Sequence, residues 1–408
     1  MKYISGLASA HLHSGQRVLS ILGSTGSIGM SALRIAAKNP EKLRVHSLAG
    51  ARNVKLLAEQ AARFRPAHLG VLDAAGADEL RLMLPPGYAP HIHTGQDGYM
   101  ALAALPEVDL VLAAQVGAAG LMPSLAAARA GKVLCLANKE ALVLAGELFR
   151  QIAGESGCVI LPVDSEHNAL FQAVMGHDGR QVRRLILTAS GGPFRTKSAK
   201  ALERVTPEQA LAHPNWSMGA KISIDSATMM NKGLEIIEAV HLYGMAPQEV
   251  DVVVHPQSIV HSLAEYEDGS QLAHLGIPDM EIPIGYCLGY PERLQTGLEP
   301  LDLTRIGTLT FEAPDTGRFP CLDLARTALR EGTAHCVVLN AANEVAVQAF
   351  LDRRISFPGI ARLIEDMLAT APCGEFHDPE SILDLDREAR RTADAAIGDG
   401  RAQMRQHP

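Results

Sequence analysis

The feature that most constrains the fold of this chain is a short apolar run that leads directly into a glycine-rich turn and a helical pattern. Residues 17–22 (RVLSIL) have the composition of a strand, GSTGSIG follows at 23–29, and residues 31–38 continue with helical spacing. The glycines stand three apart, so Gly23 allows a tight turn and Gly29 allows close helix–strand packing. A motif in this context binds a dinucleotide pyrophosphate at the helix N-terminus. A glycine turn without a ligand is the alternative, because the spacing G-x-x-G-x-x-G departs from G-x-G-x-x-G.

The end of the second predicted strand, residues 43–49, bears on the choice of cofactor. NAD-binding folds place Asp or Glu about twenty residues after the glycines, where it binds the ribose 2′-hydroxyl. Here Arg52 and Asn53 follow the strand instead. An arginine suits the 2′-phosphate of NADP(H). The sequence therefore favours NADPH, and a solvated surface arginine is the alternative.

Further short apolar runs alternate with helical patterns along the following part of the chain. They occupy residues 69–72, 108–113, 133–136 and 159–163. Continuous apolar strands separated by helices predict a parallel sheet covered on both faces. Ligands of such sheets bind beyond the carboxyl ends of the strands. Polar clusters follow two of these ends, Asn-Lys-Glu at 138–140 and Asp-Ser-Glu-His-Asn at 164–168.

The pattern changes towards the middle of the chain, which predicts an α/β protein of several parts. An N-terminal Rossmann-like parallel sheet is followed by a central α+β catalytic domain and a C-terminal helical domain. Further strands are expected at 184–189, 250–254, 258–266 and 270–275, and C-terminal helices at 322–330, 337–351, 358–369 and 379–397. The predicted boundaries are 1–163 for the NADPH-binding domain with an extension at 1–16, 164–299 for the central domain with a lid loop at 212–223, 300–320 for a linker and 321–408 for the helical domain.

Residues 213–238 (HPNWSMGAKISIDSATMMNKGLEIIE) hold the only tryptophan, Trp216, among side chains that bind anions or metals. The first half contains Pro and Gly without a period and is expected to be a loop, whereas the second half has apolar residues at helical spacing. Ser226 and Asn231 are then expected near a helix N-terminus, which favours a phosphate. This predicts a mobile lid beside an anion site. A polar loop before an ordinary amphipathic helix is the alternative.

Three carboxylates are candidates for a metal site. Asp164 and Glu166 stand two apart at a predicted strand end, so in extended backbone their side chains point the same way. With Glu235 they would form an all-oxygen site that suits Mg²⁺ or Mn²⁺ rather than zinc. Without a cation the three anions would repel, so a loose or acid-shifted site is expected. The alternative is that Asp164 only caps a helix and Glu235 only faces solvent.

Composition excludes several classes of protein. A net charge of −8 argues against nucleic-acid binding. The six cysteines include no C-x-x-C pair, which indicates neither a disulfide framework nor a zinc knuckle and favours a reducing, cytoplasmic compartment. The N-terminus lacks the apolar core of a secretory signal. The uncharged stretch 110–128 contains Gln, Gly and Pro, and it is expected to be a strand, turn and helix rather than a membrane span.

Seven motifs along the chain resemble those of the 1-deoxy-D-xylulose 5-phosphate reductoisomerase family. They fall in order from about residue 18 to 350 and read GSTGSIG, ANKEAL, PVDSEHNALFQ, ASGGPF, HPNWSMGAKISIDSATMMNKGLEIIEA, HPQSIVHS and LNAANEVAV. The resemblance implies a homodimeric NADP-dependent oxidoreductase that acts on a CH–OH group in the non-mevalonate (MEP) isoprenoid pathway. It implies that NADPH and Mg²⁺, Mn²⁺ or Co²⁺ are used to convert 1-deoxy-D-xylulose 5-phosphate into 2-C-methyl-D-erythritol 4-phosphate.

The resemblance also implies the roles of individual residues. Those implied to bind the metal are Asp164, Glu166 and Glu235. Those implied to contact the phosphosugar or to form the lid are Lys139, Ser165, Glu166, Ser190, His213, Trp216, Met218, Ser226, Asn231, Lys232 and Glu235. Those implied to bind NADPH are Thr25, Gly26, Ser27, Ile28, Arg52, Asn53, Asn138, Glu140 and Gly219.

The chain departs from the family pattern at two places. Ala51-Arg52-Asn53 stands where the family often has Gly-Lys-Asn, and the N-terminus is about a dozen residues longer than the family needs. Two other functions stay open at the level of sequence. One is an NADP-dependent oxidoreductase that acts on another phosphorylated substrate without rearrangement, and the other is a non-catalytic dinucleotide sensor. Metal-dependent NADPH oxidation with 1-deoxy-D-xylulose 5-phosphate would distinguish all three.

Overall fold

The computed structural model describes residues 15–398 except 217, 375 and 377. Nearly all of the predicted extension at 1–16 therefore lies outside the described residues. Within them, no helix combines the length and apolar character needed to cross a membrane.

The first sheet has seven strands in the order β4-β3-β2-β1-β5-β6-β7, and each neighbouring pair is parallel. Its strands are β1 (Arg17–Leu22), β2 (Leu43–Ala49), β3 (His68–Val71), β4 (His91–Thr94), β5 (Leu110–Ala113), β6 (Val133–Leu136) and β7 (Val159–Pro162). The predicted parallel sheet is confirmed. Strand β4 was not predicted, because its sequence, HIHT, contains a single aliphatic residue and is at least partly exposed throughout.

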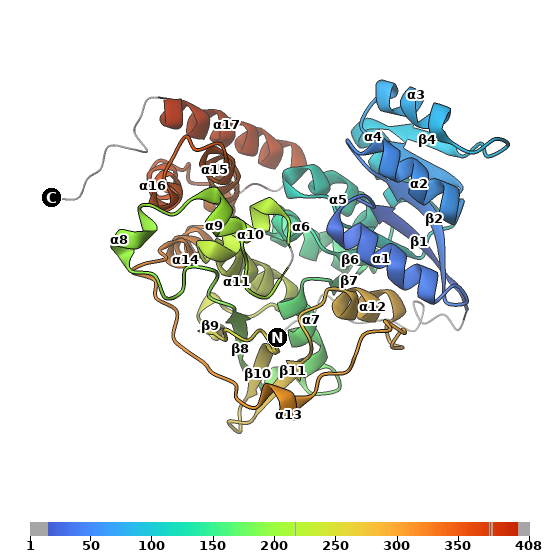
Figure 1. The fold of residues 1–408 in the computed structure, drawn as a ribbon. Helices are drawn as coiled ribbons and strands as arrows, with labels where there is room; N and C mark the ends of the chain where they lie inside the picture. Colours follow the sequence, from blue (N-terminus) through green and yellow to red (C-terminus); the bar gives the residue numbers. More distant parts are fainter. Residues whose placement is uncertain (1–14, 217, 375, 377, 399–408) are drawn as a thin grey trace.

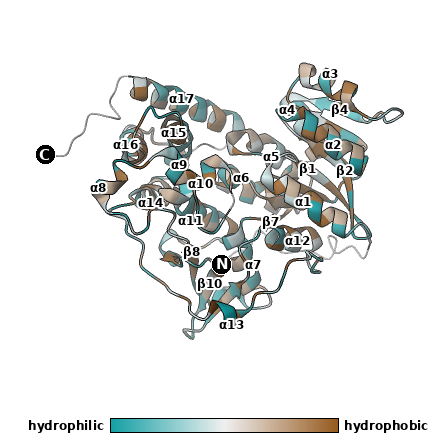
Figure 2. Ribbon diagram, viewed as in Figure 1, coloured by the Kyte–Doolittle hydropathy of each residue, from teal (hydrophilic) through white to brown (hydrophobic). Residues whose placement is uncertain are grey.

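Helices cover both faces of this sheet (Figure 1). They are α1 (Ser27–Lys38), α2 (Val54–Phe64), α3 (Ala74–Met83), α4 (Gly95–Ala103), α5 (Leu121–Arg129) and α6 (Lys139–Ser156). Along β5, Leu110 and Leu112 belong to one apolar core and Val111 to the other, as the alternation of a strand buried on both faces requires. In Figure 2, α1 and α2 carry both hydrophilic and hydrophobic residues, as amphipathic helices that cover a core do.

The chain reverses its direction of travel across the sheet between β1 and β5, which opens a crevice at their carboxyl ends. The glycine turn lies at this point. Gly23 has a φ of +91°, and a Cβ on Gly29 would lie 2.4 Å from the carbonyl oxygen of Gly23. The two roles predicted for these glycines, a tight turn and close packing of α1, are confirmed.

The second sheet has four strands in the order β11-β10-β8-β9. Its strands are β8 (Val182–Ala189), β9 (Val250–Val254), β10 (Val260–Tyr266) and β11 (Gln271–Leu275). Associated helices are α7 (Ser165–Val174), α8 (Ala199–Leu202), α9 (Pro207–Leu211), α10 (Ala220–Ala227) and α11 (Met230–Tyr243), and short 3₁₀ turns are η3 (Gly179–Gln181) and η4 (Pro247–Glu249). The helix α12 (Glu281–Gly289) packs instead on α1, and the 3₁₀ turn η2 (Gly117–Gly120) follows β5 of the first sheet. The stretch 213–238 is inserted between β8 and β9, as predicted.

Two predictions within this insertion are wrong. The predicted loop ends earlier than expected, because α10 already begins at Ala220. Ser226 lies in the last turn of α10 rather than near a helix N-terminus. Met229, with a left-handed φ of 64°, turns the chain from α10 into α11, where Asn231 does lie in the first turn.

The C-terminal part is helical, as predicted. Its helices are α14 (Cys321–Glu331), α15 (Thr333–Leu351), α16 (Phe357–Leu368) and α17 (Pro379–Gly398). The segment predicted to be a linker, 300–320, contains one short helix that was not predicted, α13 (Leu303–Ile306). Helix α14 packs on α11, and α15 packs on α6. The C-terminal part therefore supports the two helices that carry Lys232 and Lys139. The domain boundaries themselves remain a prediction.

Candidate active site

A cavity of about 630 Å³ lies at the carboxyl edge of the parallel sheet, where α10 and α11 face it. Most of the predicted site residues line it, namely Gly26, Ser27, Ile28, Lys139, Glu140, Asp164, Ser165, Glu166, Ser190, His213, Trp216, Met218, Gly219, Ser226, Asn231 and Lys232. The predicted residues outside this lining are Thr25, Arg52, Asn53, Asn138 and Glu235. The glycine turn and the polar clusters after β6 and β7 therefore share one space.

The three predicted metal ligands converge. One carboxylate oxygen from each of Asp164, Glu166 and Glu235 lies within 4.8 Å of the others. Glu235 is fully buried, so the alternative that it faces solvent is excluded. Three oxygen donors of this kind fit a hard divalent cation such as Mg²⁺ or Mn²⁺.

The backbone conformation at Asp164 and Glu166 differs from the prediction. Asp164 is the N-cap of α7 and its side chain accepts the backbone N–H of Glu166 at 3.3 Å. Glu166 is therefore helical, and the extended pair expected from the sequence is wrong. Helix capping and membership of the carboxylate cluster, which the sequence presented as alternatives, hold together for Asp164.

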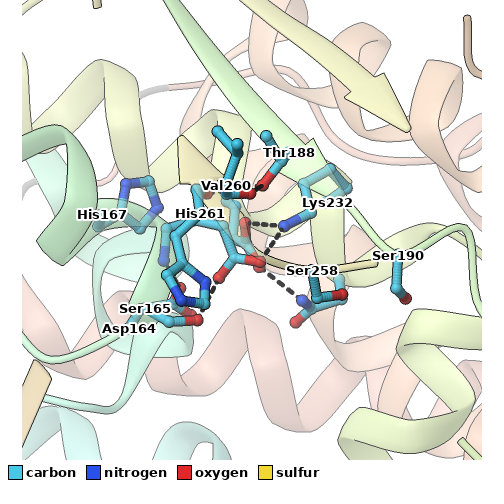
Figure 3. Close-up of polar contacts among 12 residues, drawn as sticks. Asp164, Ser165, His167, Thr188, Ser190, Lys232, Ser258, Val260 and His261 are labelled. Carbon is cyan, nitrogen blue, oxygen red and sulfur yellow. Dashed lines mark hydrogen bonds and ion pairs between the residues drawn. The ribbon is translucent and has the colours of Figure 1, made fainter. Parts of the chain in front are cut away.

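Two buried lysines, Lys139 and Lys232, neutralise most of the cluster's charge, and Figure 3 shows the contacts of Lys232. The Nζ of Lys139 lies 2.5 Å from Asp164 and 3.2 Å from Glu235, and the Nζ of Lys232 lies 2.8 Å from Glu166 and 2.5 Å from Glu235. The expected repulsion holds at Glu166, whose pKa is raised by burial and by the charges of Glu235 and Asp164. At Asp164 it does not, because the expectation left out the ammonium groups.

The protonation of the cluster follows from burial and these neighbours. Burial raises the pKa of Asp164, but Lys139, His167 and Lys232 together outweigh burial and hold that pKa below its usual value. Burial and the nearby charge of Glu235 raise the pKa of Glu166. Burial lowers the pKa of Lys232, and the carboxylates of Glu166 and Glu235 more than reverse that change. The pKa of Lys139 is also raised, because Asp164, Glu235 and Glu238 together outweigh burial, so both lysines are cationic at neutral pH.

The polar wall beyond the carboxylates comes from β8 and from the inserted segment. A left-handed Gly191-Gly192 turn follows β8, and a Cβ on Gly192 would lie 2.8 Å from the carbonyl oxygen of Ser226. This close approach brings the predicted phosphate contacts Ser190 and Ser226 to the same cavity. Asn231 accepts a hydrogen bond from Lys139 at 2.8 Å and donates one to Glu235 at 2.5 Å. It therefore links the polar wall to the carboxylates.

His213 organises the start of the predicted lid. Its Nδ1 accepts the backbone N–H groups of Asn215 at 3.2 Å and Trp216 at 3.0 Å. The proton must then reside on Nε2, which lies 2.9 Å from Oγ of Ser190 and donates to it. Burial lowers the pKa of His213, which favours this neutral form. The lid loop includes residue 217, which is outside the described residues, and its mobility stays a prediction.

The residues predicted to bind NADPH divide into cavity-facing and supporting groups. Asn138 caps α6 by accepting the N–H of Ala141 and donates to the carbonyls of Gln115 and Gly117, so its amide shapes the loop after β5. Asn53 similarly caps α2, and Arg52 beside it is exposed. Gly219 opens α10 without a side-chain cap, and nothing lies within 4 Å of where its Cβ would be.

Several cavity residues were given no role from the sequence. Gln115 and Val116 follow β5, and their position at a strand's carboxyl end was the available signal. Lys221, by contrast, was counted among the side chains of 213–238 that bind anions or metals, and it pairs with Glu140 at 2.8 Å and Asp225 at 2.9 Å. His261, whose pKa is lowered to about 4 by burial, faces Trp216 with ring centroids 6.0 Å apart. The motif HPQSIVHS contains His261, so the motif itself was the signal.

Comparisons with known proteins agree along the chain. Residues 19–146 match the family described as 1-deoxy-D-xylulose 5-phosphate reductoisomerase, residues 160–243 match its C-terminal domain, and residues 275–392 match the DXP reductoisomerase C-terminal domain. The 1-deoxy-D-xylulose 5-phosphate reductoisomerase of Oleidesulfovibrio alaskensis is 62% identical over 400 residues, which cover 97% of this chain and 98% of that protein. That of Nitratidesulfovibrio vulgaris strain DP4 is 62% identical, with 96% of each chain covered.

Solved structures give the same result. A DOX-P reductoisomerase in complex with NADPH, fosmidomycin and magnesium has a TM-score of 0.90 and 45% identity, covering 94% of this chain and 98% of that one. The Zymomonas mobilis 1-deoxy-D-xylulose 5-phosphate reductoisomerase in complex with NADPH has a TM-score of 0.88 and 45% identity, covering 94% and 99%.

Proposed function

Because the chain belongs to the 1-deoxy-D-xylulose 5-phosphate reductoisomerase family, we propose which of its residues carry each part of that reaction. The enzyme is an NADP-dependent oxidoreductase of isoprenoid biosynthesis. It converts 1-deoxy-D-xylulose 5-phosphate into 2-C-methyl-D-erythritol 4-phosphate with NADPH and a divalent metal.

The observation that carries the assignment of residues is the position of the carboxylate cluster in the same cavity as the glycine turn. Asp164, Glu166 and Glu235 are proposed to hold Mg²⁺, with Mn²⁺ and Co²⁺ as further ions that this oxygen site would accept. A cation held there supplies Lewis acidity to the substrate's carbonyl and neighbouring hydroxyl while the carbon skeleton rearranges. The protein's share is to fix three ligands from two elements and to leave the cavity side open.

The phosphate of the substrate is proposed to bind the polar wall formed by Ser190, Ser226, Asn231 and Lys232. His213 supports this wall from beside Ser190, and Lys139 and Ser165 lie next to the carboxylates. Binding the phosphate remote from the reacting carbons supplies energy for orienting them. Trp216 and Met218 are proposed to close over the substrate and exclude water.

NADPH is proposed to lie along the N-terminus of α1, with its pyrophosphate on the backbone of Thr25, Gly26, Ser27 and Ile28. NADPH supplies the hydride that reduces the rearranged aldehyde. Arg52 is proposed to read the 2′-phosphate, with Asn53 holding the start of α2 beside it. Asn138, Glu140 and Gly219 are proposed to border the nicotinamide end, where the sheet meets α10.

The direct test gives purified, metal-stripped protein 1-deoxy-D-xylulose 5-phosphate and NADPH, with and without Mg²⁺. We expect NADPH oxidation only when Mg²⁺ is present, with 2-C-methyl-D-erythritol 4-phosphate identified as the product by mass spectrometry and NMR. NADPH oxidation that yields an unrearranged alcohol would contradict the proposed function.

We further propose a cytoplasmic homodimer. The six cysteines are free thiols and five of them are buried, which suits a reducing compartment. The dimer rests on the family resemblance, and light scattering after size-exclusion chromatography tests it. A mass of one chain at micromolar concentration would contradict it.

A further inference from the structure

A lysine at the cofactor side of the cavity belongs neither to the carboxylate cluster nor to the polar wall. Lys221 lies in the first turn of α10 and lines the cavity. Its Nζ lies 2.8 Å from Oε1 of Glu140, on α6, and 2.9 Å from Oδ2 of Asp225, on α10. The side chain of Glu140 is 8% exposed and that of Asp225 is 1% exposed. Lys221 therefore bridges two buried carboxylates from two different helices.

The position of Lys221 is unfavourable for a lysine without these partners. A positive charge in the first turn of a helix opposes the helix dipole, and an ammonium group that leaves water loses its hydration. Burial lowers the pKa of Lys221, but Asp225, Glu140 and Glu344 more than reverse that change. The group is therefore a cation at neutral pH, and its carboxylate partners rather than the helix favour it there.

The carboxylate of Glu140 is held on both sides. Its Oε1 accepts a hydrogen bond from Lys221 at 2.8 Å, and its Oε2 accepts one from the side-chain amide of Asn138 at 3.4 Å. Burial raises the pKa of Glu140, but Lys221, together with a backbone N–H and Lys139, outweighs burial and lowers that pKa. Glu140 therefore lines the cavity as an anion in a fixed orientation.

The three side chains of this bridge carry one net negative charge, because two carboxylates meet one ammonium group. Two further charges act on the bridge, and both are paired elsewhere. Glu344, on α15, pairs with Arg390 at 3.0 Å, and Lys139 pairs with Asp164 and Glu235. The lysine at the start of α10 is therefore the cation that offsets the two carboxylates of the bridge.

This balance matters because the two forms of the cofactor differ in charge at the nicotinamide end. The dihydronicotinamide ring of NADPH is uncharged, whereas the ring of NADP⁺ carries a positive charge. Two buried carboxylates without a counterion would attract the oxidised ring strongly, since charges interact more strongly away from bulk water. The oxidised product would then be held more tightly than the reduced substrate. A cation between the carboxylates removes most of that attraction.

We propose that Lys221 is a specificity-determining residue, which limits the preference of this site for NADP⁺ over NADPH by neutralising Glu140 and Asp225. The inference rests on the proposed function, which places the nicotinamide end of the cofactor beside Glu140. Lys221 acts through the two carboxylates and not on the reacting atoms, so it is a positioning residue rather than a catalytic one.

The test measures the affinities of NADPH and NADP⁺ for the full-length protein in the presence of Mg²⁺. NADPH is titrated by its own fluorescence, and NADP⁺ by competition with NADPH. In Lys221→Met, the affinity for NADPH relative to that for NADP⁺ should fall about ten-fold or more, because the carboxylates then face the ring without their cation. An unchanged ratio, whatever happens to each affinity, would overturn the proposal, since a merely structural loss weakens both forms equally.

A second substitution separates charge from damage. Adding Glu140→Gln to Lys221→Met removes one of the two carboxylates and so restores the original net charge. The ratio of the two affinities should return towards the wild-type value, although a further contact is lost. A ratio that stays at the value of the single variant would count against the electrostatic role. Lys200→Met, which removes an exposed charge on α8, is the matched control and should keep the wild-type ratio.

The design also covers a variant that does not fold. If thermal melting shows that Lys221→Met is unfolded, Lys221→Gln takes its place, because glutamine lacks the charge but still donates hydrogen bonds to the carboxylates. The titrations need no sugar substrate. A wild-type protein without turnover of 1-deoxy-D-xylulose 5-phosphate would therefore contradict the proposed function, whereas an unchanged ratio in the variant would contradict the role of Lys221.

Discussion

At Glu235 three donors meet one fully buried carboxylate. Lys139, Lys232 and Asn231 all approach its two oxygens. Such a group is costly to bury unless every oxygen is paired, and here the pairing is complete before any cation binds. The residue therefore has a structural role as well as the proposed role of metal ligand.

Glu235→Gln separates the two roles. The amide keeps the shape of the side chain but loses a ligand charge, so kcat should fall about a hundred-fold or more. Affinity for NADPH, measured by fluorescence titration, should change little. Glu147→Gln on the exposed side of α6 is the control and should be silent. Near-native turnover of Glu235→Gln at limiting Mn²⁺ would remove Glu235 from the metal site.

Arg52 permits a test of cofactor choice. Loss of one charge-assisted contact costs roughly 1.5–3 kcal/mol, so Arg52→Ala should raise the KM for NADPH about ten-fold or more. The KM for NADH should stay nearly constant, because NADH has no 2′-phosphate. Lys55→Ala, which removes an exposed charge in the first turn of α2, is the matched control. Equal losses with both cofactors would show that Arg52 does not read the phosphate.

His213 gives the start of the lid a dependence on pH. Its folded pKa lies below the usual 6.5, so the unfolded chain binds a proton first as the pH falls. The stabilisation from this residue is thus complete above pH 6.5 and is lost as the pH falls through 6.5 to the folded pKa. A proton on Nδ1 would displace the N–H groups of Asn215 and Trp216.

The emission of Trp216, the only tryptophan, measures this effect. Quencher accessibility should rise as the pH is lowered below about 6.5. In His213→Gln the dependence on pH should disappear, because an amide does not titrate in this range. The same pH profile in both proteins would assign the change to another group.

At the scale of elements, the turn from β1 into α1 requires a residue without a side chain at position 29. A Cβ at Gly29 would meet the carbonyl oxygen of Gly23 at 2.4 Å and Cα of Ser24 at 2.5 Å. Both are backbone atoms, so the turn itself must move. Gly29→Ala should therefore lower the free energy of unfolding by about 1–3 kcal/mol and weaken NADPH binding. Denaturant titration and NADPH titration check the two effects.

Gly154→Ala is the matched control for that variant. Gly154 lies inside α6 and nothing is within 4 Å of its Cβ position. Alanine has the higher helix propensity, so stability should rise by up to about 1 kcal/mol. If both variants lose stability equally, the cause is not the contact between Gly29 and the glycine turn.

Helices and strands could be predicted where their burial requires apolar residues at a regular spacing in the sequence. Strands β2, β6 and β9 have the predicted bounds, because each is a run of mostly apolar residues between polar turns. Strand β4 was not predicted, because its stability comes from pairing with β3 rather than from its own apolar residues. The early start of α10 escaped because Gly219, without a capping side chain, gives no start signal.

The sequence predicted which residues form the candidate site, but it did not predict how their charges are paired. The family motifs implied that Asp164 and Glu235 lie together although they are far apart in the sequence, and in the structure their carboxylate oxygens do come within 4.8 Å of each other. The sequence did not show that Lys139 and Lys232 lie between the carboxylates, because each comes from a different helix and only tertiary packing brings them there. A one-dimensional pattern carries no such distance.

At the scale of the whole molecule, the C-terminal helices reach the site through one buried hydrogen bond. Nδ2 of Asn343, on α15, donates at 2.8 Å to Asp225 of α10, and Asp225 also pairs with the cavity residue Lys221. Asn343→Ala leaves a buried carboxylate short of a donor, so the free energy of unfolding should fall by about 1–3 kcal/mol. Gln348→Ala, exposed on the same helix, is the control. Differential scanning calorimetry that finds the two variants equally stable would refute this link.

The paired lysines of the active site have a consequence for the order of events in the whole enzyme. Three carboxylates and two ammonium groups leave the cluster with one net negative charge, which a divalent cation would invert to positive. A phosphosugar carrying a doubly charged phosphate would then meet an electrostatic field of the opposite sign. Each ligand should thus increase the affinity for the other by the same factor, as thermodynamic reciprocity requires. This cooperativity would arise within one subunit, because the cation and the two lysines would pair with the same three carboxylates.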